Sequence, residues 1–195
     1  EGYGWTEGGW VTFEAKQPET LLAHSVGWPC FGNEVGVFRE DGSPCEVGEA
    51  GEVGVKSLTH FDGYIGRPEA TEATWRGGYV MSGDIGIWQA DGRLCIVDRK
   101  KDIIITGGEN VYTAEVERVL HEHADVLEAA VSGLPDERWG ERVTAAVVLR
   151  DGKLPAADAL QAFCRDRLAG YKVPRRIAYL PALPRNPMGK VQKFR

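Results

Sequence analysis

The chain has 195 residues, of which 43% are hydrophobic and 27% charged, and its formal net charge is −6. A chain of this length can bury a real core and hold one large or two small domains. No apolar run approaches the roughly 20 residues that cross a bilayer, so we expect no membrane span. The first residue is Glu1 rather than Met and no leader-like segment follows it, which favours a fragment of a longer protein without a signal peptide.

Charge is distributed unevenly along the chain. Residues 1–98 carry a net charge of −10 and residues 99–195 a net charge of +4, which predicts two units with different roles. The tail from Lys172 to Arg195 has seven basic residues and no acidic one. Its apolar residues and four prolines are typical of a packed segment rather than a free basic arm, so we expect no nucleic-acid partner.

The four cysteines are widely scattered, and no CxxC pair occurs among them. This spacing argues against a zinc site and against a disulfide framework. Reduced thiols are typical of a cytoplasmic protein, and we expect that location.

The first half of the sequence predicts strands. Residues 1–10 hold four glycines and two tryptophans, and we expect a pocket-shaping loop there, without helix or strand. From Gly27 to Val97, short apolar runs alternate with turn pairs such as Asp41-Gly42 and Asp91-Gly92. This alternation predicts a small antiparallel β unit that resembles a barrel.

The second half predicts helices against a small sheet. We expect Thr113 to cap a first helix, and Pro155 and Gly170 to begin and end a second. Strands are expected at 127–132, 143–149 and 177–180. The apolar faces of the two helices combine seven residues: Val116, Val119, Leu120, Leu160, Phe163, Cys164 and Leu168.

Between the halves lies the stretch DRKKDIIITGGEN, from Asp98 to Asn110. Its five charged residues lead into the β-branched run 103–105, which predicts a buried strand. Gly107 and Gly108 follow, and glycine lets the backbone take positive φ or approach a ligand closely. Charge, strand and glycine together predict a swivel beside a binding surface.

Four segments combine into a recognisable order: YGWTE at 3–7, SGDIG at 82–86, the 98–110 stretch, and NPMGK at 186–190. At these separations they resemble the adenylate-forming superfamily, which includes acyl-CoA synthetases, luciferases and peptide-synthetase adenylation domains. GYIGRPEAT, GLPDERWGE and GYKVPR are further phrases similar to that family. The resemblance covers essentially the whole chain.

The resemblance implies an α+β fold in two parts. Residues 1–98 would be the end of the large AMP-binding domain, with its barrel-like β subdomain, and residues 99–195 the mobile C-terminal lid. Relatives carry a Ser/Thr/Gly-rich phosphate loop before the YGxTE segment, and no such loop is found in this sequence. We therefore expect the C-terminal portion of such an enzyme, whose missing N-terminal region is a necessary partner.

For the first part, the resemblance implies a nucleotide site for ATP and AMP. Tyr3, in the same motif as Gly4, would stack on adenine. Thr6 would bind the α-phosphate, and Glu7 would hold Mg²⁺, a cation that prefers oxygen ligands. Asp84 would accept both ribose hydroxyls. The segment that holds Trp5 and Trp10 would border the acyl pocket, and two indoles favour a compact or aromatic acid.

For the second part, the resemblance assigns Arg99 to the ribose or phosphate and Lys101 to the pivot of the lid. Lys100 and Asp102 receive no function. Gly107 and Gly108 would line the slot for the pantetheine thiol of CoA. Trp139 is interpreted as a packing residue of the lid.

Lys190 carries the sharpest expectation. It would stabilise the negative charge that grows between the carboxylate substrate and the α-phosphate. The segment from Pro184 to Lys190 also resembles sites at which acyltransferases silence relatives, because acetylation removes the lysine charge.

The resulting hypothesis is an AMP-forming acid–CoA ligase that uses a small-molecule carboxylic acid, ATP, CoA and Mg²⁺. One alternative is an adenylation domain that loads a carrier protein. Another is an inactive fragment that serves only as a binding or interaction module. We expect the isolated fragment to be inactive, because the phosphate loop lies outside it.

Overall fold

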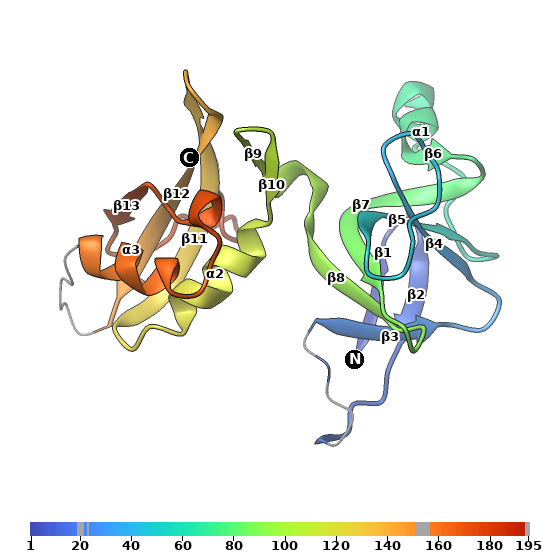
Figure 1. Ribbon diagram of the computed structural model, residues 1–195. Coiled ribbons are helices and arrows are strands. Elements are labelled where there is room, and N and C mark those ends of the chain that lie inside the picture. The colour runs from blue at the N-terminus through green and yellow to red at the C-terminus, as the bar shows by residue number, and fades with distance from the viewer. Residues whose placement is uncertain (19–21, 23, 151–156, 194–195) are drawn as a thin grey trace. The chain divides into compact units, whose positions relative to one another are not determined.

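The computed structural model describes residues 1–18, 22, 24–150 and 157–193 (Figure 1). The chain forms two compact units, Glu1–Lys101 and Asp102–Arg195. Their boundary falls after Lys101, inside a short 3₁₀ turn at Lys100–Asp102.

The first unit is one antiparallel sheet in the order β1-β2-β3-β8-β7-β5-β4, with β6 paired to β7. Within the described residues β1 and β4 are its edges, so the antiparallel unit expected from the sequence is an open sheet rather than a closed barrel. The helix α1 (Pro68–Thr74) precedes β6. The strands are β1 Gly2–Trp5, β2 Gly9–Phe13, β3 Ser25–Pro29, β4 Glu34–Phe38, β5 Ala50–Lys56, β6 Trp75–Arg76, β7 Tyr79–Trp88 and β8 Leu94–Arg99.

Two apolar clusters stabilise this sheet. β5 contributes Val53 to one cluster and Val55 to the other, and the strand has a register shift between Glu52 and Gly54, next to these residues. The first cluster also contains Val37 and Leu94, and the second Val11. Tyr3 packs against both clusters.

The expectation that residues 1–10 lack strands is wrong, because β1 and β2 form a hairpin there. A Cβ at Gly4 would lie 2.1 Å from the Gly9 carbonyl oxygen, and a Cβ at Gly8 would lie 2.4 Å from the Trp5 ring. At Gly4 the two backbones therefore approach more closely than a side chain would allow, and at Gly8 the Trp5 ring takes the space of a side chain. Since glycine contributes nothing to an alternating apolar pattern, the strands left no such signal in the sequence.

The second unit has two helices, α2 (Thr113–His121) and α3 (Ala157–Arg165), which lie against its sheet (Figure 1). The order is β10-β9-β12-β11, and β13 pairs with β12 in parallel. The α+β fold expected from the sequence is confirmed. The strands are β9 Ile104–Thr106, β10 Glu109–Val111, β11 Val126–Asp136, β12 Gly140–Leu149 and β13 Arg176–Tyr179.

The core of this unit confirms both predicted helix faces. Six of the seven residues predicted to line them are buried, and Phe163 is partly buried against the same cluster. A smaller cluster of Ala130, Val148 and Leu183 also contains the partly buried Val191 and fixes the tail to the sheet.

Three local predictions for the second unit are wrong. Tyr112 occupies the cap position of α2, while Thr113 is its first helical residue. The second helix ends at Arg165, and Gly170 begins a separate 3₁₀ turn. Ile105 is 56% exposed because the short strand β9 buries only the neighbouring Ile104 and Thr106. Pro155 lies outside the described residues.

None of the helices that the structure describes is long and apolar enough to cross a membrane. All four cysteines are free thiols, and burial raises the pKa of Cys45, Cys95 and Cys164.

Candidate functional site

In the first unit, the structure brings together Tyr3, Asp84 and Arg99. Asp84, on β7, is 7% exposed and stands opposite Arg99 of β8 in the sheet register. Its Oδ1 lies 3.1 Å from Nε of Arg99, and its Oδ2 accepts a hydrogen bond of 2.8 Å from the Tyr3 hydroxyl. The Asp84 amide donates to Oγ of Ser82 at 3.0 Å. The carboxylate is therefore held in one orientation from both sides.

Tyr3 serves as a hydrogen-bond donor at neutral pH. Burial of the ring and the neighbouring Asp84 carboxylate raise the pKa of the phenol well above its ordinary value. The ring lies 5.6 Å from that of Trp5, tilted by 44°. Its stacking on adenine stays a prediction. Each oxygen of a carboxylate can accept more than one hydrogen bond, so ribose hydroxyls can still donate to Asp84.

The turn between β1 and β2 carries Thr6 and Glu7. Thr6 is exposed. Glu7 is half-buried, and its Oε1 accepts a hydrogen bond of 2.5 Å from the Tyr64 hydroxyl. The Glu7 carbonyl oxygen accepts another of 2.8 Å from the Phe61 amide. Tyr64 had no role in the sequence-based assignment.

Glu7 has the properties of a cation ligand. None of the described basic side chains forms an ion pair with it, so its charge is uncompensated. The described residues also contain no group of three or more His, Cys, Asp and Glu side chains suited to a metal. A single carboxylate fits Mg²⁺, which is usually held by one or two carboxylates together with substrate phosphates and water.

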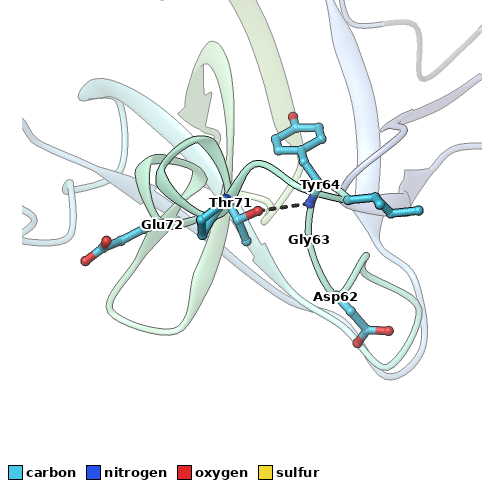
Figure 2. Close-up of a pocket in the computed structure, with 7 residues that line it drawn as sticks. Asp62, Gly63, Tyr64, Thr71 and Glu72 are labelled. Atoms are coloured by element: carbon cyan, nitrogen blue, oxygen red, sulfur yellow. Dashed lines mark hydrogen bonds between the residues drawn. The ribbon is translucent and has the colours of Figure 1, made fainter.

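An open pocket of about 500 Å³ lies beside this turn (Figure 2). Figure 2 shows the Tyr64 amide donating to Oγ1 of Thr71, a bond of 2.9 Å that ties the loop to α1. The hydrogen bond to Glu7 is the main cause that raises the pKa of the Tyr64 phenol. The pocket is lined by Asp62, Gly63, Tyr64, Ile65, Pro68, Thr71 and Glu72.

The end of the first unit is fastened by an ion pair that sequence reasoning missed. Nζ of Lys100 lies 2.8 Å from Oε2 of Glu52, a residue that is 8% exposed. The same oxygen lies 3.2 Å from NH2 of Arg76. Lys101, the predicted pivot, is exposed and follows directly. No local pattern reveals this anchor, because Glu52 lies 48 residues before Lys100.

In the second unit, Gly107 and Gly108 form the turn between β9 and β10. Both have positive φ, +61° and +86°, as the sequence predicts. The Gly107 amide donates to the Trp139 carbonyl oxygen at 2.8 Å, and a Cβ at Gly107 would lie 2.9 Å from Cε3 of that indole. A Cβ at Gly108 would meet nothing within 4 Å. The indole of Trp139 thus packs on the first glycine, and the second presents bare backbone.

Two guanidinium groups stack on Trp139. Cζ of Arg138 lies 4.7 Å from the ring, and Cζ of Arg175 lies 4.8 Å from it. Such cation–π contacts hold the charges beside the glycine turn. The sequence reading assigned no function to either arginine.

Lys190 lies near the C-terminus of the second unit, on a loop that hydrogen bonds hold in place. Oδ1 of Asn186 accepts hydrogen bonds from the amides of Met188, at 3.0 Å, and Lys190, at 2.9 Å. Arg185 donates to the Gly189 carbonyl oxygen at 2.8 Å and pairs with Glu128 at 2.6 Å. The side chain of Lys190 is exposed and forms no ion pair with any described residue. The loop therefore presents a free ammonium group.

Comparisons with known proteins place this chain among adenylate-forming enzymes. Residues 115–190 match the family described as AMP-binding enzyme C-terminal domain. The 2-succinylbenzoate–CoA ligase of Geobacillus kaustophilus is 46% identical over 97% of this chain and 39% of its own length. A feruloyl-CoA synthase of Amycolatopsis is 43% identical over 99% and 40%.

Solved structures agree. The o-succinylbenzoate CoA synthetase of Bacillus subtilis, in complex with its acyl-adenylate intermediate, matches with a TM-score of 0.89 and 39% identity, over 97% of this chain and 39% of that one. The amide bond synthetase of Marinactinospora thermotolerans matches with a TM-score of 0.88 and 40% identity, over 98% and 40%.

The chain spans about two fifths of the length of the curated relatives it matches. It belongs to the adenylate-forming superfamily and corresponds to the C-terminal portion of its acyl-CoA ligases.

Proposed function

We propose that the protein carrying this chain is an AMP-forming acid–CoA ligase. A carboxylic acid attacks the α-phosphorus of ATP, pyrophosphate leaves, and the CoA thiol then displaces AMP from the acyl-adenylate to give a thioester. The observation that carries the proposal is the match of nearly the whole chain to acid–CoA ligases at 42–46% identity. In this reading residues 1–98 complete the nucleotide site, and residues 99–195 are the moving lid.

The nucleotide is held by the first unit in this proposal. Asp84 accepts from the ribose hydroxyls, and Tyr3 offers its ring face to adenine. Arg99 reaches the ribose or phosphate. Thr6 donates to the α-phosphate, and Gly4 contributes backbone beside the nucleotide in the same motif. The ion pair and the phenol bond at Asp84 support this assignment, because they fix the acceptor before the ligand arrives.

Glu7 would ligate Mg²⁺ together with the phosphates of ATP. When bound, the cation neutralises charge on the phosphate oxygens. The uncompensated carboxylate at this turn supports the assignment.

Lys190 would place its ammonium between the acid and the α-phosphate during adenylation. A fixed loop and an unpaired charge are what such a role requires. Acetylation by a protein acyltransferase would remove this charge and switch the enzyme off.

Gly107 and Gly108 would serve the second half-reaction, in which the pantetheine thiol passes along their bare backbone. The guanidinium groups of Arg138 and Arg175 stand beside this turn and suit the phosphates of CoA. Rotation of the lid about Lys101 would present Lys190 for the first step and the glycines for the second.

A compact or aromatic acid is the substrate that we infer. Trp5 lies within the nucleotide motif and Trp10 shortly after it, and relatives at 43–46% identity include a 2-succinylbenzoate–CoA ligase and a feruloyl-CoA synthase. We also infer a cytoplasmic location.

The test is ATP–pyrophosphate exchange by the whole protein and by its Lys190→Gln variant. We expect a loss of roughly 10²–10³-fold, the cost of removing one transition-state charge partner. Full exchange by the variant would refute both the catalytic and the acetylation roles. Met188→Ala, at an exposed neighbour in the same loop, is the control.

Two further assays separate the alternatives. Acyl transfer is measured once with free CoA and once with a phosphopantetheinyl carrier protein as the acceptor, and we expect transfer to CoA. The isolated 195 residues should show no exchange, because the phosphate loop of the relatives is not among them. Robust exchange by this piece would contradict that expectation.

A further inference from the structure

We propose that Tyr64 is a positioning residue for Glu7: its hydroxyl fixes one carboxylate oxygen so that the other faces the cation. The inference rests on the proposed function, since it assigns a partner to the Mg²⁺ ligand of that reaction. It begins from the 2.5 Å hydrogen bond between the Tyr64 hydroxyl and Oε1 of Glu7, two residues 57 positions apart in the chain.

The loop that carries Tyr64 is attached to the nucleotide turn twice. Besides the phenol bond, the Phe61 amide donates to the Glu7 carbonyl oxygen at 2.8 Å. The ring of Phe61 packs edge-on against Tyr64 at 5.0 Å, and it belongs to the cluster of Val11, Val55 and Val80. The hydroxyl is thus held from the core of the unit.

The other side of the loop is attached to α1. Oγ1 of Thr71 accepts from the Tyr64 amide at 2.9 Å (Figure 2). It also donates to the Arg67 carbonyl oxygen at 3.0 Å. Tyr64 is therefore fixed at its backbone, its ring and its hydroxyl. A group held in this way can orient a partner without a large loss of conformational entropy.

The chemical consequence concerns the geometry of the carboxylate. Glu7 is a long side chain in a turn. Among the residues that the structure describes, only the Tyr64 side chain forms a hydrogen bond or ion pair with it. With Oε1 held by the phenol, the direction of Oε2 is set. Hydrogen bonds to the outer oxygen of a ligating carboxylate typically contribute about 10–100-fold to metal affinity or activity.

The test is Tyr64→Phe in the whole protein, which removes only the hydroxyl. ATP affinity is measured by titration calorimetry twice, with Mg²⁺ and with EDTA. We expect about a tenfold loss of affinity with Mg²⁺ and no change with EDTA. The apparent KM for Mg²⁺ should rise similarly in pyrophosphate exchange. Tyr79→Phe is the matched control, because that hydroxyl also bonds a carboxylate, Glu34, on a different part of the sheet.

The outcomes separate the two proposals. If the unaltered protein binds ATP no more tightly with Mg²⁺ than with EDTA, the metal assignment of the proposed function fails. If it does bind more tightly and Tyr64→Phe behaves identically, the positioning role is refuted. Equal losses with Mg²⁺ and EDTA would also refute it, since they indicate a general defect of the fold. In a Glu7→Gln background, Tyr64→Phe should add no further loss.

Discussion

The Tyr3 hydroxyl donates to Oδ2 of Asp84 across 81 residues of sequence, at 2.8 Å. Arg99 binds the opposite oxygen of the same carboxylate. A nearly buried Asp84 is thereby kept oriented by one neutral donor and one cation, each from a different strand. In the proposed enzyme this arrangement prepares the ribose acceptor before ATP binds.

Replacing Tyr3 by Phe tests that preparation. The variant keeps the ring and removes the donor, so Asp84 loses one of its fixed hydrogen bonds. We expect ATP affinity to fall about fivefold, because a hydrogen bond of this kind contributes about 1 kcal/mol. Titration calorimetry on the whole protein measures the change. An unchanged dissociation constant would show that Arg99 orients the carboxylate alone.

The raised pKa of Tyr3 predicts a dependence on alkaline pH. The phenol has an ordinary pKa of 10.0, and burial and Asp84 raise the pKa in the folded state. The unfolded state therefore releases this proton first, so the stability due to Tyr3 is complete below pH 10 and falls as pH rises toward the folded-state pKa. The Tyr3→Phe variant lacks this decline.

Absorbance at 295 nm reports phenolate directly. Titrating the native protein from pH 8 to about 11 should give the same phenolate signal for Tyr3→Phe as for the parent, because Tyr3 stays protonated in that range. A parent signal larger by nearly one phenolate group at pH 11 would contradict the buried hydrogen bond.

The sequence predicted the parts of the fold that depend on side-chain periodicity. Val116, Val119 and Leu120 occupy positions i, i+3 and i+4, which share one face of a helix, and all three are buried. The hairpin of β1 and β2 escaped prediction because Gly4 allows close backbone approach, Gly8 makes room for the Trp5 ring, and neither residue adds to a side-chain pattern. The β-propensity of the individual residues does not predict such a strand, because glycine is rare in strands.

The residues of the candidate site also fall into those that the sequence predicted and those that it did not. Asp84 and Arg99 lie in motifs, and the structure brings them together. Tyr64 and Lys100 were left without roles because their partners, Glu7 and Glu52, are 57 and 48 residues away. Pairings at such separations follow from strand order, which no single segment encodes.

The loop of Lys190 predicts a difference between two substitutions of Asn186. Asn186→Asp keeps an oxygen that accepts from the Met188 and Lys190 amides, whereas Asn186→Ala removes it. We expect the alanine variant to lose about 10-fold in kcat for adenylation, since a displaced catalytic group costs up to roughly 10²-fold. The aspartate variant should retain most of the rate.

Pyrophosphate exchange at saturating ATP measures this step, and thioester formation from supplied acyl-adenylate provides the control, because the proposed role of Lys190 is confined to adenylation. Equal rates for the two Asn186 variants would argue against a fixed loop. A parallel loss in both half-reactions would indicate damage to the whole lid.

Gly107 and Gly108 are expected to respond differently to alanine. Gly107→Ala adds a Cβ that would lie 2.9 Å from the Trp139 ring, on a backbone with φ of +61°, so it should destabilise the lid. Overpacking of this kind typically costs about 1–3 kcal/mol. Gly108→Ala meets no atom within 4 Å and carries only the strain of its φ of +86°. The expected cost there is about 1 kcal/mol.

The decisive comparison is Gly108→Ala against Gly48→Ala. Gly48 has a similar φ, +84°, is equally open, and lies in a turn of the first unit. Because both variants bear the same strain, only a methyl in the thiol path should matter for the second half-reaction. We expect Gly108→Ala to slow thioester formation from acyl-adenylate at least about tenfold, a difference of 1.4 kcal/mol in the barrier, while pyrophosphate exchange continues. If both variants transfer the acyl group to CoA at the parent rate, the glycine turn does not line the route of the thiol.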